Sequence, residues 1–184
     1  TAGYALASTL TLIGLFSYIV SVQQIYGELY GLGTLFPLAF GASSIGVAIA
    51  ALISARLVRL FGMRPVAHGA MLIYTLSGLV LFGISLGGNP PFWVTFGLLS
   101  VCMMAFGVLQ GNVNAIALEP LGHIAGTASS LFGVVTMTIA TVLGGVVGQA
   151  YDGTVVPIGF AFGVGGLFAV LAVIWTERGR LFGR

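Results

Sequence analysis

The sequence predicts an all-α membrane protein with six transmembrane helices. Of its 184 residues, 58% are hydrophobic and only 5% are charged, whereas a soluble domain typically carries about 25% charged residues. Six mostly apolar runs each approach or exceed the ~20 residues that a membrane-spanning helix needs. A closed β-barrel would instead show alternating strands of ~10 residues, and these runs are too long and too uniformly apolar for that architecture.

The apolar runs follow one another as a single transmembrane domain over residues 1–184, with no linker or soluble domain between them. The predicted spans cover 4–26, 35–59, 66–86, 92–118, 126–150 and 157–176. Glycine and proline interrupt the hydrophobic pattern between spans, which indicates turns, at 27–31, 61–65, 87–91, 119–122 and 152–157. Because all five connections are short, neighbouring helices should run antiparallel. Small residues four apart, such as Gly144 and Gly148, favour close helix packing in lipid.

The basic residues predict the orientation of the chain. All six are arginines; three flank the second connection and three follow the last span: Arg56, Arg59, Arg64, Arg178, Arg180 and Arg184. With six spans, both groups lie on one side of the membrane, and the opposite connections contain no Lys or Arg. The positive-inside rule therefore places both chain ends in the cytoplasm. Because the charges are few and lie at helix ends, the net charge of +2 does not indicate a nucleic-acid partner.

The sequence lacks the residue combinations that several kinds of functional site require. The single cysteine, Cys102, allows no internal disulfide, and the two separated histidines, His68 and His123, do not make a metal site. The sequence contains no Ser-His-Asp arrangement, nucleotide-binding motif or mid-span charged residue. We therefore expect neither an enzyme nor a bound cofactor or metal. Since intramembrane ionisable residues usually mark proton relays, this chain does not by itself supply an obvious proton carrier.

Two polar stripes are the candidates for ligand contact. Ser17, Ser21, Gln24 and Glu28 recur at helical spacing on the first span, with Tyr18 beside them, and the fourth span carries an amide pair four residues apart. A buried amide in hydrocarbon is costly unless it is hydrogen-bonded. The amides either lock helices together or line a wet cavity, and Glu28 is either a solvated loop acid or a rim carboxylate. The candidate substrate contacts are Tyr18, Ser21, Gln24, Gln110 and Asn114.

Charged residues gather on the predicted cytoplasmic side. Arg56, Arg59 and Arg64 share this side with Glu119, which lies in the turn after the fourth span. The arginines could simply extend their side chains to the membrane interface. Alternatively, they form a charge cluster with Glu119 that braces the cytoplasmic helix ends and holds one state of a gate.

Three segments resemble one transporter family. The segment 117–133, ALEPLGHIAGTASSLFG, closely resembles the connection between the tenth and eleventh helices of major facilitator superfamily drug:proton antiporters of the bicyclomycin-resistance (Bcr/CflA) type. Residues 16–19 resemble the start of the seventh helix in that family. Residues 54–64 resemble its connection between helices eight and nine, with Gly62 and Arg64 kept. Arg59 stands where the full loop motif has an acid, so the complete relay of that motif is not expected.

The resemblance implies that the chain is the C-terminal half, helices seven to twelve, of a twelve-helix transporter built from inverted three-helix repeats. The start at Thr1 rather than Met agrees with a fragment of a longer chain. The N-terminal half, which in this family holds most proton-coupling groups, would then be a partner outside this sequence.

The function implied by the resemblance is proton-coupled export of small amphipathic, drug-like molecules across the bacterial inner membrane by alternating access. The expected partners are the small-molecule substrate, protons, the lipid bilayer and the missing half. The alternatives are a six-helix half-transporter that homodimerises, an uncoupled channel or facilitator, and a membrane enzyme.

Overall fold

The computed structural model describes residues 2–177, except for the side chain of His123, so that Arg178, Arg180 and Arg184 lie outside the described residues. The described residues form six long helices, each long and apolar enough to cross a membrane. Their bounds are α1 (Ala2–Gln23), α2 (Phe36–Phe61), α3 (Met63–Ser85), α4 (Phe92–Leu118), α5 (Ala125–Gln149) and α6 (Val156–Thr176). No strand occurs within residues 2–177, so the predicted all-α fold class is confirmed.

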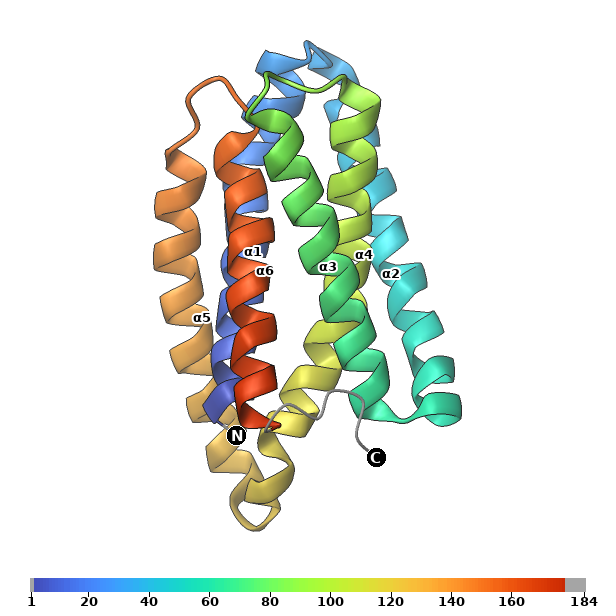
Figure 1. The fold of residues 1–184 in the computed structure, drawn as a ribbon, viewed down its shortest axis with the longest axis vertical. Helices are drawn as coiled ribbons and strands as arrows, with labels where there is room; N and C mark the ends of the chain where they lie inside the picture. Colours follow the sequence, from blue (N-terminus) through green and yellow to red (C-terminus); the bar gives the residue numbers. More distant parts are fainter. Residues whose placement is uncertain (1, 178–184) are drawn as a thin grey trace.

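The helices form one elongated bundle (Figure 1). Helices α1, α3, α4 and α6 pack together in its middle, while α2 packs mainly on α4 and α5 mainly on α1. The start of α1, the α2–α3 turn and the ends of α4 and α6 lie at the same end of the bundle, at the bottom of Figure 1. We call it the arginine end, after Arg56, Arg59 and Arg64.

The packing pattern repeats after three helices. The contact of α1 with α5 corresponds to that of α4 with α2, and the contact of α1 with α6 corresponds to that of α4 with α3. Helix α1 runs away from the arginine end whereas α4 runs toward it, so the two three-helix units are inverted relative to one another. Helices α1 and α4 are therefore equivalent members of the two repeats, and they also contact each other.

Glycines set the closest helix contacts. A Cβ atom at Gly78 of α3 would lie 2.5 Å from the backbone of Phe162 and Gly163 in α6, and a Cβ at Gly144 of α5 would lie 2.8 Å from the Ile13 carbonyl oxygen of α1. Only a residue without a side chain allows backbones to approach this closely, which is the packing that small residues provide in membranes.

Helix α1 does not end at residue 26, as its hydrophobic pattern predicts. It continues as a π-helix over Gln24–Leu29, a wider coil that often marks functional positions in helices. Tyr26 lies inside this segment, fully buried, with its ring 5.6 Å from that of Phe92 and 6.5 Å from that of Phe36 between centroids. This aromatic packing lets the helix continue past Gly27. The predicted turn after α4 is a 3-10 helix, Glu119–Ile124.

Candidate functional site

The amide pair of α4 lies against α1. Gln110 Nε2 donates a hydrogen bond to Ser8 Oγ at 2.8 Å, and Ser8 Oγ donates to Asn114 Oδ1 at 2.9 Å. The Thr11 hydroxyl lies 3.4 Å from Gln110 Oε1. Both amides are half-buried, while Ser8 and Thr11 are fully buried. These four residues, which we call the amide network, join the two equivalent helices of the repeats.

The contacts of the amides bear on both sequence-based interpretations, as helix locks and as the lining of a wet cavity. The hydrogen bonds to Ser8 tie α1 to α4, as the interpretation of the amides as helix locks requires. However, Asn114 Nδ2 has no hydrogen-bond acceptor among the described residues, and its side chain is only half-buried. The lock therefore leaves the Asn114 amide donor unused within the described residues. The partners Ser8 and Thr11 were not predicted; the only sequence signal is the hydroxyl-rich run from Ser8 to Thr11.

The polar stripe predicted on α1 does not form one continuous face. Ser17 Oγ donates to the Ile13 carbonyl oxygen at 2.8 Å and lies 3.2 Å from the Gly144 carbonyl oxygen of α5. Ser21 is buried and bonds back to the Ser17 carbonyl. The next two positions fall in the π-helical segment, where Gln24 is half-buried and Glu28 is exposed.

Tyr18 lies next to this stripe but faces a different helix. Its ring stacks on that of Phe40 in α2, with centroids 6.0 Å apart and planes 13° from parallel. Of the residues predicted to contact substrate, Gln110 and Asn114 are thus brought together, whereas Tyr18, Ser21 and Gln24 lie apart from them along α1.

Charged groups form a second network at the arginine end. Arg64 Nη2 lies 3.5 Å from Glu119 Oε2, and Arg64 Nε lies 3.9 Å from Glu177 Oε1. The Tyr4 hydroxyl donates to Glu177 Oε1 at 2.7 Å and shares a 2.9 Å hydrogen bond with His68 Nε2. This charge network of Tyr4, Arg64, His68, Glu119 and Glu177 connects the ends of α1, α3, α4 and α6.

The charge network differs in membership from the predicted cluster. Arg64 and Glu119 are paired, but Arg56 and Arg59 are exposed on α2, and among residues 2–177 neither forms an ion pair with a carboxylate. Tyr4 and Glu177 were not predicted, since they lie 173 residues apart and only the fold brings them together.

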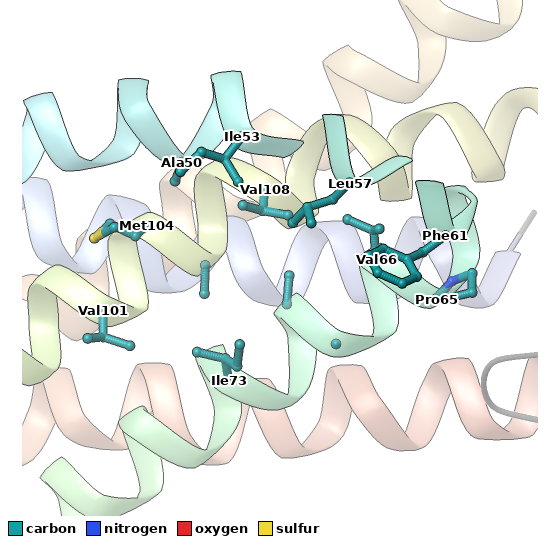
Figure 2. Close-up of a pocket in the computed structure, with 13 residues that line it drawn as sticks. Ala50, Ile53, Leu57, Phe61, Pro65, Val66, Ile73, Val101, Met104 and Val108 are labelled. Carbon is teal, nitrogen blue, oxygen red and sulfur yellow. The ribbon is translucent and has the colours of Figure 1, made fainter. Parts of the chain in front are cut away.

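An apolar groove on the bundle has none of the predicted site residues in its lining. It measures about 570 Å³ and runs between α2, α3 and α4, with side chains such as Ile53, Ile73 and Met104 facing its interior (Figure 2). Near the arginine end it adjoins a more polar hollow of about 700 Å³ that is lined by Arg64 and Glu119. The apolar groove contains neither member of the amide pair.

Comparison with known proteins identifies two relatives. The chain is 28% identical over 183 residues to a bicyclomycin resistance protein homolog of Haemophilus influenzae, covering 99% of this chain and 46% of that protein. It is 23% identical over 180 residues to the uncharacterized MFS-type transporter YdgK of Bacillus subtilis, covering 97% of this chain and 44% of that protein. No family model matches the chain, and no solved structure matches it.

The chain spans about half the length of the curated relatives it matches. One relative is named an MFS-type transporter and the other a bicyclomycin resistance protein homolog, and each match extends over nearly all of this chain. The six apolar helices indicate a multi-pass membrane protein. The resemblance predicted from the sequence motifs is therefore confirmed: this membrane protein is similar, over nearly its whole length, to one half of a major facilitator superfamily transporter.

Proposed function

We propose that the chain is the C-terminal six-helix half of a secondary active transporter that exports small amphipathic, drug-like molecules in exchange for protons. The observation that carries the proposal is the amide network, which places half-buried amides where the equivalent helices of two inverted repeats meet. The name of the Haemophilus influenzae relative, a bicyclomycin resistance protein homolog, supports export of a drug-like cargo. Neither relative is named as an enzyme, and we propose a transporter rather than an enzyme.

We propose that Gln110 and Asn114 contact the substrate because each keeps a hydrogen-bonding group that the amide network uses weakly or not at all. Asn114 Nδ2 is the donor left over by the amide network, and Gln110 Oε1 has only the long contact with Thr11. Tyr18, Ser21 and Gln24 would extend the contact surface along α1. Binding sites of this kind are mostly apolar with a few well-placed polar groups, which matches an amide pair in an apolar bundle.

The charge network would act as the gate at the arginine end, which we place in the cytoplasm at the bacterial inner membrane. Arg64 and Glu119 would hold the ends of α3 and α4 together in one of the two states of alternating access. Arg56 and Arg59 would join them when α2 moves. The proton-coupling groups and the opposite wall of the cavity would come from an N-terminal six-helix half.

Transport by the full-length protein tests the proposal. In everted membrane vesicles, a fluorescent amphipathic cargo should accumulate when the proton gradient is present and leak out when an ionophore collapses it. The variants Gln110→Ala and Asn114→Ala should lower accumulation several-fold at normal expression. The matched control Gln149→Ala removes an exposed amide at the end of α5 and should transport as the parent does.

Two outcomes would contradict this assignment. Accumulation that ignores the collapsed gradient would indicate an uncoupled facilitator. If both amide variants are well expressed and accumulate every tested cargo as the parent does, Gln110 and Asn114 are not part of the substrate site. The native mass of the purified protein distinguishes a twelve-helix monomer from a dimer of six-helix chains.

A further inference from the structure

A small, mostly apolar hollow lies between α1, α2 and α4. The hollow measures about 220 Å³ and is lined by side chains of all three helices. We call it the tyrosine hollow and define it by Tyr18, Phe40, Ser43, Met103 and Phe106. The stacked rings of Tyr18 and Phe40 form one wall, and Met103 and Phe106 of α4 form another. Aromatic faces and a methionine thioether are surfaces on which another aromatic ring packs favourably.

Two tyrosine hydroxyls, that of Tyr18 in the lining of the hollow and that of Tyr26 behind the lining, have hydrogen-bonding capacity that the described residues do not use. Tyr18 is 3% exposed and Tyr26 is fully buried, yet the hydroxyl of neither forms a hydrogen bond with any described residue. Each hydroxyl lies close enough to the other and to Ser43 to interact with it, but not in the geometry of a hydrogen bond, and Ser43 itself lines the hollow. A buried hydroxyl without a partner is destabilising, so two together favour a polar group of a ligand.

The charge of such a ligand is limited by the lining. The side chains that line the tyrosine hollow include no carboxylate and no basic group. An ion placed there would lose its hydration without gaining a counter-charge, which is far more costly than burying a neutral polar group. The group that enters the hollow must therefore be uncharged, even if another part of the same molecule carries a charge.

The equivalent hollow of the other repeat has a different chemistry. It lies between α4, α5 and α1, measures about 340 Å³, and is lined by apolar side chains such as Leu131 and Val135. Its buried Thr136 hydroxyl donates to the Phe132 carbonyl oxygen at 2.7 Å and so has its partner. The hydroxyls left without partners at the tyrosine hollow therefore do not follow from the repeat architecture itself.

We propose that the tyrosine hollow binds an uncharged aromatic group that carries a hydroxyl or carbonyl substituent, with the ring against Phe40 and Phe106 and the substituent at the Tyr18 and Tyr26 hydroxyls. This proposal rests on the transport function proposed above, because it assigns the hollow to the aromatic part of the cargo. It adds a chemical criterion for the cargo that the amide network does not supply.

Equilibrium binding to the full-length protein in lipid nanodiscs tests the proposal. The probes are radiolabelled 1-naphthol and naphthalene, which share a ring system and differ in one hydroxyl, with empty nanodiscs subtracted. Tyr18→Phe and Tyr26→Phe should each weaken 1-naphthol binding about five- to tenfold, the loss expected for one hydrogen bond, and leave naphthalene binding unchanged. Phe40→Leu should weaken both probes, and the control Thr136→Val in the equivalent hollow should change neither.

Folding does not obscure this test, because removal of an unpaired buried hydroxyl should leave the thermal midpoint unchanged or raise it. The proposal is wrong if the two Tyr→Phe variants bind 1-naphthol as tightly as the parent does. It is also wrong if they weaken naphthalene binding as much as they weaken 1-naphthol binding. The transport assay separates the two proposals: coupled transport with unchanged 1-naphthol binding overturns the hollow alone. Hydroxyl-dependent binding without coupled transport supports the hollow and overturns the transport function.

Discussion

Ser8 is the residue on which the contact between α1 and α4 depends most. Its hydroxyl accepts from Gln110 and donates to Asn114, so Ser8→Ala removes two hydrogen bonds and leaves a half-buried amide donor without its acceptor. We expect a loss of about 1–3 kcal/mol in the free energy of unfolding, measured as a lower thermal midpoint in detergent. The control Ser129→Ala removes an exposed hydroxyl that bonds only within its own helix. Equal midpoints for the two variants would contradict this role of Ser8.

Asp152, in the loop between α5 and α6, gives a second prediction at the residue scale. Its carboxylate accepts hydrogen bonds from the Thr154 hydroxyl at 2.6 Å and the Thr154 amide at 3.1 Å, and the hydroxyl bond is the main cause of a lowered Asp152 pKa. Because the folded-state pKa lies below the unfolded value, the stabilising contribution is present above the unfolded pKa and is lost as the pH falls through the lowered one.

Thr154→Val should therefore raise the Asp152 pKa toward its ordinary value of about 3.9. The measurement is a carboxyl-carbon NMR titration of aspartate-labelled protein, in which the signal that moves on substitution is Asp152, the single aspartate of this chain. Thr127→Val, at an exposed position of α5, is the control. An Asp152 pKa that is the same in parent and Thr154→Val would show that the hydroxyl does not set it.

Sequence patterns located the polar residues of the amide network but not their partners. An amide in an apolar run stands out, so Gln110 and Asn114 could be singled out from α4 alone. Serine and threonine are common in membrane helices and can bond to their own backbone, as Thr9 does to the Ala5 carbonyl. Nothing in the local sequence distinguishes Ser8, which bonds across to α4, from such a residue.

At the scale of elements, the contact of α3 with α6 gives the sharpest prediction. A Cβ at Gly78 would meet the α6 backbone at 2.5 Å, whereas a Cβ at Gly83 on the same helix would meet nothing within 4 Å. Gly78→Ala should therefore push the helices apart and cost about 1–3 kcal/mol. Gly83→Ala should leave stability unchanged or raise it by up to about 1 kcal/mol, because alanine favours the helix. Thermal midpoints that fall equally would contradict the close contact as the cause.

Helix positions follow well from hydropathy because each helix must satisfy its backbone inside the membrane. The change from α-helix to π-helix at Gln24 could not be predicted, since it depends on how Tyr26 packs against Phe36 and Phe92 from two other helices. The same limit applies to the charge network, in which the first and last helices meet through Tyr4 and Glu177.

At the scale of the whole molecule, the two inverted repeats share their helix packing but differ in their polar side chains. Both repeats supply a central helix, a helix that packs on the other repeat's central helix, and a third that completes the core. Polar groups depart from this symmetry: Gln110 and Asn114 lie on α4, whereas the tyrosine hydroxyls lie on α1. The shared geometry explains the fold, and the unshared side chains are where specificity for a cargo would arise.

The charge network is the feature by which the whole bundle could favour one conformation. The side chains of Arg64 and Glu119 are 39% and 68% exposed, and exposed ion pairs typically contribute about 0–1 kcal/mol. Loss of the pair should therefore change stability little. Two conformations of a transporter can differ by only a few kcal/mol, so about 1 kcal/mol would still shift their ratio roughly fivefold.

Glu119→Gln should accordingly shift the balance between conformations, and Glu177→Gln should shift it further, because Glu177 also accepts the hydrogen bond from Tyr4. The measurement is the rate at which a maleimide labels a cysteine placed at Ala115, which lines the hollow beside Glu119. The native Cys102 is buried and should contribute little labelling. Glu28→Gln, which makes the same substitution at an exposed glutamate outside the charge network, should label as the parent does. Identical labelling rates for the parent and both glutamate variants would show that the network holds no conformational state.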